Sequence, residues 1–188
     1  MRLCFFAGLL SCTQQSLAQS QKDTVIATDW PVLTYCIDPD WLPYEAIEKG
    51  QHIGMSSGYL QRLKQRTGLE FRLRPTNSWS ETLQLLREGS CDLTPMLNQS
   101  ENRQDFLVFS DVYLYAPNVL VSSREEPFLQ GLEHIGERRL AIPKDYRLLE
   151  YVQRHFPALD VLEVESEKDG LMAVAHGRAE VFVGSLYS

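Results

Sequence analysis

The sequence predicts an α/β protein, because strand-like and helix-like segments alternate along most of the chain. Short runs rich in β-branched and aromatic residues are followed by segments in which apolar residues recur every three to four positions. Two of the helix-like segments also open on a capping residue, Ser78 with Glu81 and Ser166 with Asp169. This alternation is typical of βαβ units, whose strands form a parallel sheet.

The first half of the chain is predicted to contain three strands and two helices. The first helix stops before Gly68 and the second before Gly89, because glycine accepts the left-handed conformation that closes a helix. Trp79, Leu83 and Leu86 recur at helical spacing, so they share one apolar face of the second helix. In chain order the elements are a strand at 32–37, a helix at 56–67, a strand at 70–74, a helix at 78–88 and a strand at 91–97.

The second half repeats this organisation with four strands and two helices. The two sets meet near Tyr115-Ala116-Pro117, where one pattern ends and the next begins. We therefore divide the mature chain into a first lobe at 19–116 and a second lobe at 117–188. The predicted elements are strands at 118–122, 139–144, 161–166 and 180–185, and helices at 146–155 and 166–177.

The N-terminus has the pattern of a secretory signal peptide. Met1-Arg2 carries a positive charge, residues 3–10 are apolar, and Ser16-Leu17-Ala18 supplies the small residues of a cleavage site. We therefore predict a signal peptide at 1–18 and an extracytoplasmic mature protein. Two alternatives are lipid attachment at Cys12 and a buried N-terminal strand or helix. No later segment of the sequence is long and apolar enough for a membrane helix.

The composition argues against several classes of function. The chain has 25 acidic and 18 basic residues among 188, for a formal net charge of −7, and its basic residues form no cluster. Nucleic-acid-binding proteins usually have the opposite charge balance, with Lys and Arg gathered on one face, so we expect no nucleic-acid partner. The sequence has no nucleophile motif, no His/Cys cluster with metal-ligand spacing and no phosphate-binding loop. We therefore expect a protein that is not an enzyme and that needs neither a metal nor a cofactor.

Cleavage of the signal peptide would leave two cysteines, Cys36 and Cys91. Both adjoin strand-like runs, and an even number of cysteines in an oxidising compartment permits one disulfide. The alternative is two buried thiols that act as small apolar side chains. The sequence leaves both possibilities open.

Five segments follow one another in an order that is found in a known protein family. They are Asp38-Pro39-Asp40-Trp41-Leu42-Pro43-Tyr44, the helix entry from Gly54 to Leu60, Trp79-Ser80-Glu81 with Leu86 to Asp92, Ser100-Glu101-Asn102-Arg103 with Phe109-Ser110-Asp111-Val112-Tyr113, and Gly170 to Glu180. Each segment is a weak signal alone, but together they resemble cluster 3 of the bacterial periplasmic solute-binding proteins. The resemblance runs from about Val32 to Ser185.

The resemblance implies a "Venus flytrap" fold, in which two α/β lobes enclose a ligand cleft. It also places the mature protein in the periplasm. In the family the chain crosses back to the first lobe after a second connection. This sequence ends at Leu186-Tyr187-Ser188, about where that connection should begin. We therefore expect the first lobe to be incomplete, with its final return segment missing.

The resemblance also indicates candidate binding residues. In family members that take amino acids, the arginine that matches Arg103 pairs with the ligand's α-carboxylate, as a planar guanidinium can with two parallel bonds. Ser100 would add a hydroxyl donor, Tyr44 would stack on the ligand, and Asn98 would lie at the end of its strand. The alternatives are a surface position for Arg103 and a core position for Tyr44.

The second lobe departs from the amino-acid-binding pattern of the family. Lys144-Asp145-Tyr146 stands where a Gly-Ser/Thr turn would offer amides to a carboxylate. The aspartate that receives an α-ammonium group is replaced by Gly184 or Ser185. A standard α-amino acid is therefore not the expected ligand. If Arg103 does not carry recognition, residues of the second lobe such as Tyr146 must do so.

Three functions are compatible with this resemblance. The pattern is most similar to sensor-type input domains of the family, so we expect binding of a small polar solute that serves a membrane-bound signalling protein. The alternatives are the solute receptor of an ABC uptake transporter, with a membrane permease as its partner, and a small dehydratase-like periplasmic enzyme. We expect the chain to be a monomer.

Overall fold

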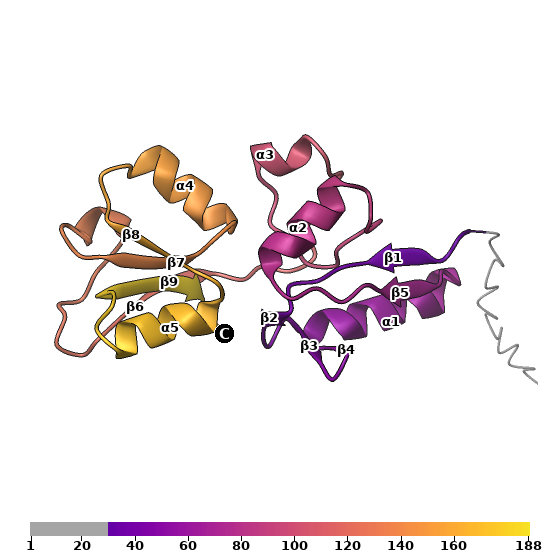
Figure 1. The fold of residues 1–188 in the computed structure, drawn as a ribbon, viewed down its shortest axis with the longest axis horizontal. Coiled ribbons are helices and arrows are strands. Elements are labelled where there is room, and N and C mark those ends of the chain that lie inside the picture. The colour runs from indigo at the N-terminus through magenta and orange to yellow at the C-terminus, as the bar shows by residue number, and fades with distance from the viewer. Residues whose placement is uncertain (1–29) are drawn as a thin grey trace, which may run out of the picture.

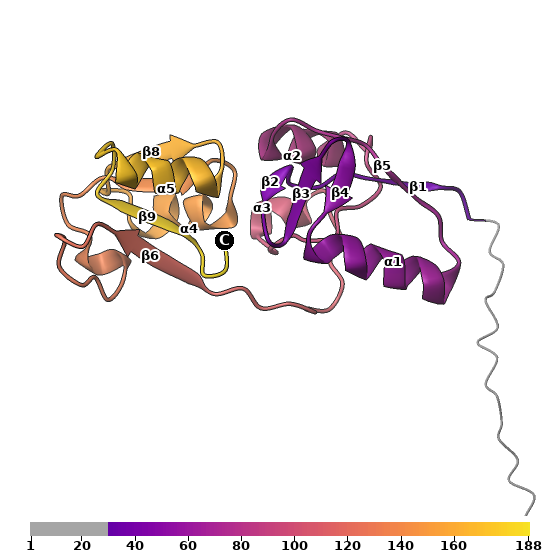
Figure 2. The ribbon, with the colours of Figure 1, turned by 90° about the horizontal axis from the view of Figure 1, so that it is seen from below.

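The chain folds into two lobes that lie side by side and are joined by an extended segment (Figure 1). The computed structural model describes residues 30–188, so the predicted signal peptide and Cys12 lie outside the described residues. Figure 2 shows the segment ahead of Asn118 running along one side of the molecule from the first lobe to the second. Within residues 30–188, no helix has the length and apolar character needed to cross a membrane.

The first lobe contains two small sheets and three helices. Its strands are β1 (Leu33–Tyr35), β2 (Asp40–Trp41), β3 (Glu45–Glu48), β4 (Gln51–Ile53) and β5 (Phe71–Leu73), and its helices are α1 (Met55–Thr67), α2 (Trp79–Arg87) and α3 (Glu101–Gln104). β1 pairs with β5 in parallel, whereas β2, β3 and β4 form an antiparallel sheet. After β1 the chain runs directly into the loop and hairpin that contain residues 38–45.

The strand predicted at 91–97 is wrong. Leu93 makes only a single parallel bridge to Tyr35, and Pro95 lacks the amide hydrogen that a strand ladder requires. The two cysteines nevertheless lie together. Cys36 and Cys91 form a disulfide, with their Cα atoms 5.9 Å apart.

The antiparallel sheet β2–β4 was not anticipated from the sequence. Its strands are two to four residues long and largely polar, so they offer too little periodicity to be recognised. The turn between β3 and β4 has positive φ angles of 51° at Lys49 and 76° at Gly50. A two-residue hairpin turn requires this backbone conformation.

Both long helices of the first lobe are bounded much as the glycine and capping patterns predict. α1 ends at Gly68 with φ 73°, and the amide of Gly68 bonds the carbonyl of Lys64. The hydroxyl of Ser78 accepts a bond of 3.2 Å from the amide of Glu81 at the start of α2. The carboxylate of Glu81 accepts from the amide of Asn77, one residue before the expected partner, at 2.8 Å.

The second lobe has one mixed sheet between two layers of helix. Its elements are β6 (Asn118–Ser122), the 3₁₀ turn η1 (Leu132–His134), β7 (Leu140–Pro143), α4 (Arg147–His155), β8 (Val161–Val164), α5 (Glu167–Ala175) and β9 (Val181–Ser185). The strand order is β6-β9-β7-β8, with β7 parallel to both β8 and β9, and β6 antiparallel to β9. The elements predicted for this half of the chain are therefore confirmed to within two residues at each end.

The core of the second lobe lies on both faces of β7, whose four residues are all buried. Leu149 and Val152 of α4 pack on one face, and Ala173 of α5 packs with Phe182 on the other. Gly170 lets α5 approach the sheet, because a Cβ atom there would lie 2.3 Å from the ring of Phe182. The three parallel strands all end toward the first lobe, where open α/β sheets place their ligands (Figure 1).

Candidate functional site

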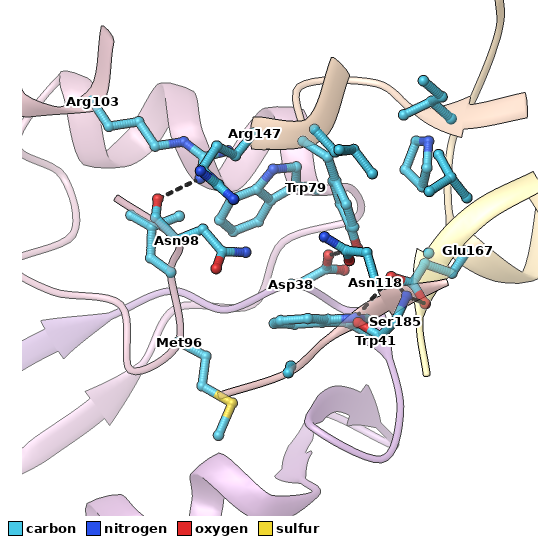
Figure 3. Close-up of a pocket in the computed structure, with 18 residues that line it drawn as sticks. Asp38, Trp41, Trp79, Met96, Asn98, Arg103, Asn118, Arg147, Glu167 and Ser185 are labelled. Carbon is cyan, nitrogen blue, oxygen red and sulfur yellow. Dashed lines mark hydrogen bonds between the residues drawn. The ribbon is translucent and has the colours of Figure 1, made fainter. Parts of the chain in front are cut away.

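A pocket lies between the two lobes and is lined by residues of both (Figure 3). The first lobe contributes the loop after β1, the start of α2, the segment 96–98 and α3. The second lobe contributes the first residue of β6, the ends of β7 and β9, the start of α4 with the turn before it, and the first residue of α5. Its free space is about 40 Å³, which is enough for a few water molecules. The lining includes Asp38, Trp41, Trp79, Met96, Asn98, Arg103, Asn118, Tyr146, Arg147, Glu167 and Ser185.

Arg103 is a buried cation at one side of this pocket, with only 3% of its surface exposed. Its guanidinium donates at 2.7 Å to the carbonyl of Asn98 and at 2.7 Å to the carbonyl of Asp145, while Nε has no hydrogen-bond partner. None of the ion pairs among the described residues includes Arg103. Burial lowers the pKa of Arg103. The arrangement therefore leaves a desolvated positive charge that neutral carbonyls compensate only in part.

Three buried carboxyl groups, Asp38, Glu45 and Glu167, lie at the other side of the pocket or directly behind it. Asp38 accepts hydrogen bonds from the amide of Asp40 at 3.0 Å and from the hydroxyl of Tyr146 at 2.7 Å. Burial raises the pKa of Asp38 to about 6. The Tyr146 hydroxyl stays protonated as a donor, because burial and then the neighbouring Asp38 raise its pKa well above the usual value.

Glu45 supports Asp38 from behind the pocket. Its carboxyl group accepts from the amide of Asp38 at 2.9 Å and from the hydroxyl of Ser56 at 2.9 Å. Burial raises the pKa of Glu45 to about 8, so this group holds a proton at neutral pH. Glu45 fixes the loop that carries Asp38, although it does not line the pocket itself.

Glu167 comes from the second lobe, at the first turn of α5. Its carboxylate accepts from the Trp41 indole at 3.2 Å and from the amide of Ser185 at 3.1 and 3.2 Å. A carboxylate is favoured at this place, because a helix N-terminus carries partial positive charge. Glu167 was missed by the sequence analysis, which looked for a second-lobe carboxylate at 184–185. Its signal was an acidic residue immediately after a helix cap at the end of a parallel strand.

The aromatic side chains of the site differ from those expected. Tyr44 is 1% exposed and lies behind Trp41, with the ring centroids 4.5 Å apart. Trp41, three residues earlier, is the one that lines the pocket. Trp79, which the helical pattern places in the core, also lines it. The ring of Tyr146 meets Trp41 and Trp79 edge-on, at centroid distances of 6.2 and 6.3 Å.

The remaining two candidates lie at different depths. The side chain of Asn98 points into the pocket near Arg103 (Figure 3). Ser100 precedes α3 and lies instead at the rim, where its hydroxyl is 3.4 Å from the carboxylate of Glu150 in the second lobe. A second cavity, with about 220 Å³ of free space, lies at this rim and is lined by Ser100, Arg147 and Glu150 among others.

The groups that converge on the pocket suit binding through charge, hydrogen bonds and aromatic surface. Arg103, Asn98, Tyr146 and two carboxylates line one pocket, whereas Ser100 and Tyr44 do not line it. Among residues 30–188, no three His, Cys, Asp or Glu side chains are grouped as metal ligands. A small polar molecule is therefore the kind of partner that this arrangement fits.

Comparison with known proteins identifies relatives among sensor proteins. The virulence sensor protein BvgS of Bordetella pertussis is 25% identical over 167 residues, which is 88% of this chain and 14% of BvgS. The sensor protein EvgS of Escherichia coli K12 is 22% identical over 179 residues, which is 95% of this chain and 15% of EvgS. The chain thus spans only about a seventh of the length of these relatives.

Solved structures show the same fold. The periplasmic VFT2 domain of Bordetella pertussis BvgS superimposes with a TM-score of 0.72 and 25% identity, over 82% of this chain and 66% of that domain. A histidine kinase sensor domain with similarity to periplasmic binding proteins gives a TM-score of 0.77 at 23% identity, over 82% of this chain and 68% of that domain. The predicted two-lobed α/β fold and the resemblance to sensor-type domains are confirmed. Residues 33–177 match the bacterial extracellular solute-binding proteins, family 3, and the chain belongs to that family.

Proposed function

We propose that this chain is the solute-binding input domain of a periplasmic sensor and that it takes a small polar solute with an anionic group. The observation that carries the proposal is Arg103, a buried guanidinium in the inter-lobe pocket with a free Nε and no carboxylate partner. A carboxylate can bind such a guanidinium through two charge-assisted hydrogen bonds. The sensor role is supported by the two named relatives, both of which are sensor proteins.

The rest of the pocket supports selection of a polar solute. Asn98 and Asn118 supply amide groups that both donate and accept hydrogen bonds, and Asp38 supplies an acceptor. Trp41 and Trp79 supply flat apolar walls against which a small molecule can pack. The predicted lobe division at residue 117, export through a signal peptide and a monomeric state belong to the same proposal.

The test begins with a thermal-shift screen of the secreted protein against mono- and dicarboxylates, hydroxy acids and amino acids. Each compound that raises the melting temperature is then titrated by calorimetry into the wild type and into Arg103→Ala. We expect Arg103→Ala to weaken binding by about 30- to 1000-fold, because it removes a charged and desolvated hydrogen-bond partner.

Two further variants separate recognition from folding. Arg103→Lys keeps the positive charge but loses the bidentate geometry, so it should bind with intermediate affinity. Arg62→Ala removes an arginine that is exposed on α1 and should bind like the wild type. Equal affinity of folded Arg103→Ala and wild type for the same compound would show that Arg103 does not recognise the solute. Turnover of a compound during titration would favour the dehydratase alternative.

A further inference from the structure

The turn after β7 brings Tyr146 into the pocket from the second lobe, and the exposed Asp145 beside it contacts side chains of the first lobe. Asp145 has φ 61°, a left-handed conformation that residues other than glycine rarely adopt. This conformation aims its carbonyl at the first lobe, where it accepts from Arg103 at 2.7 Å and from the Trp79 indole at 3.2 Å. The Asp145 carboxylate accepts a further hydrogen bond from the hydroxyl of Ser80. A single residue thus bonds three side chains across the cleft.

Tyr146 continues these contacts deeper into the pocket. Its hydroxyl donates to Asp38 at 2.7 Å, and its ring packs against the first-lobe cluster of Cys36, Trp79 and Cys91. Tyr146 therefore belongs to the second lobe by sequence and to the first-lobe core by packing. With this side chain in place, the remaining free space of about 40 Å³ is far below the volume of a drug-sized ligand site, which is roughly 300 Å³ or more.

We propose that the Asp145–Tyr146 turn holds the two lobes closed in the solute-free protein, with the Tyr146 side chain filling part of the solute pocket. The turn supplies what a solute would supply: an oxygen acceptor for Arg103 and a donor for Asp38. The Asp145 carbonyl is neutral, however, and hydrogen bonds between two ionised groups are stronger than those with a neutral partner. An anionic solute therefore has an advantage over the turn at Arg103.

The contacts of the turn also define the solute more closely, a step that rests on the proposed function. A molecule that replaces the turn needs an anionic acceptor for Arg103 and, at a distance, a hydroxyl or ammonium donor for Asp38. It also needs a flat or aliphatic middle that fits between Trp41 and Trp79. Simple anions without a donor satisfy only one end of the pocket.

The closure can be tested without any solute, because the three tryptophans of the chain report on it. The indoles of Trp41 and Trp79 donate across the cleft, to Glu167 and to Asp145. Trp30 is 67% exposed and serves as an internal reference. We expect hydrogen exchange of the first two indole N–H groups, followed by NMR in solute-free protein, to be at least about tenfold slower than that of Trp30.

Variants then connect this protection to the turn. Tyr146→Ala removes the ring and the hydroxyl and should bring the indole exchange of Trp41 and Trp79 close to that of Trp30. Tyr115→Ala, at a position that is 83% exposed, is the matched control and should leave the protection unchanged. If Tyr146→Ala does not fold, Tyr146→Phe keeps the ring, removes only the bond to Asp38, and should accelerate exchange at Trp41.

Two results would overturn the proposal. Equally fast exchange of all three indoles in the wild type would show that the lobes are open in solution. Unchanged protection in a folded Tyr146→Ala variant would show that closure does not depend on the turn. Neither result depends on finding a solute, so the closure can fail while the carboxylate role of Arg103 stands, and the reverse also holds.

Discussion

At the scale of single residues, Glu45 links the stability of the fold to pH. It is fully buried, and its folded pKa of about 8 lies far above the usual value of 4.5 for a glutamate. Between these two values the folded state binds a proton that the unfolded state has released. The contribution of Glu45 to the free energy of unfolding is therefore highest at acidic pH. It falls as the pH rises and is lost once the pH passes the folded pKa of about 8.

We expect wild-type protein to lose about 1 kcal/mol of unfolding free energy between pH 7 and pH 9 from this group, as measured by urea denaturation. Glu45→Gln should remove that slope. The range avoids Asp38, which titrates near 6 in the folded state, and His52, whose pKa burial lowers below 6.5. Glu48→Gln, an exposed position on the same strand, is the control. The same slope in Glu45→Gln and wild type would contradict the assignment.

The sequence identified Arg103 and Asn98, which line the inter-lobe pocket, but it did not identify which aromatic residue faces the cleft. Arg103 could be predicted because its segment, Ser100-Glu101-Asn102-Arg103, resembles a family motif whose arginine binds a carboxylate. The structure places its side chain in the lining of the pocket. The loop at 38–44 offers two aromatic residues, and nothing in its composition tells which one faces the cleft. The β2–β3 hairpin decides it by turning Trp41 toward the pocket and Tyr44 into the core.

At the scale of elements, Gly54 and Gly58 form a matched pair at the start of α1. Gly54 has φ 99°, and a Cβ atom there would lie 2.7 Å from the carbonyl oxygen of Tyr44. Gly58 lies inside the helix with open space around it. We expect Gly54→Ala to destabilise the protein by about 2 kcal/mol or more, because it combines backbone strain with a clash.

A substitution at Gly58 should change the stability in the opposite direction. Gly58→Ala is expected to stabilise the protein by about 0.5–1 kcal/mol, since alanine loses less backbone entropy in a helix. Thermal and urea unfolding of both variants measure the difference. A Gly54→Ala variant as stable as Gly58→Ala would show that the approach of α1 to the β3 strand is not constrained at this glycine.

Element predictions were accurate in the second lobe because β7 and β9 are buried along their whole length and α4 packs its apolar face on the sheet. The first lobe was harder, for a physical reason. Its antiparallel strands are too short to develop a period, and the segment at 91–97 is held by a disulfide and one bridge instead of a ladder. Composition at 91–97 is strand-like, but Pro95 and the bond at Cys91 override it.

At the scale of the whole molecule, contacts across the cleft couple the two lobes. Arg103 and Tyr146 each bond the opposite lobe, and Glu101 pairs with Arg154 at the rim at 3.0 Å. We expect wild-type protein to unfold in urea as one transition that circular dichroism and tryptophan fluorescence report identically. The double variant Arg103→Ala/Tyr146→Ala should separate the two curves.

A control isolates this coupling from general loss of stability. Arg62→Ala/Tyr115→Ala changes the same residue types at exposed positions and should keep a single transition. Coincident curves in the cleft variant would mean that the lobes are coupled by the connecting segment alone. How the lobes meet could not be read from the sequence, because contacts such as Tyr146 to Asp38 join residues more than a hundred positions apart.

The charged groups of the pocket are distributed asymmetrically, with arginines at one side and carboxylates at the other. Arg103 and Arg147 lie at one side, near the N-terminus of α4, which has no side-chain cap (Figure 3). Asp38 and Glu167 lie at the other, and Glu167 neutralises the N-terminus of α5. Aligned charges and helix dipoles act over several ångströms in a desolvated cleft. We therefore expect a molecule with opposite charges at its two ends to bind in one orientation, with its anionic end toward Arg103.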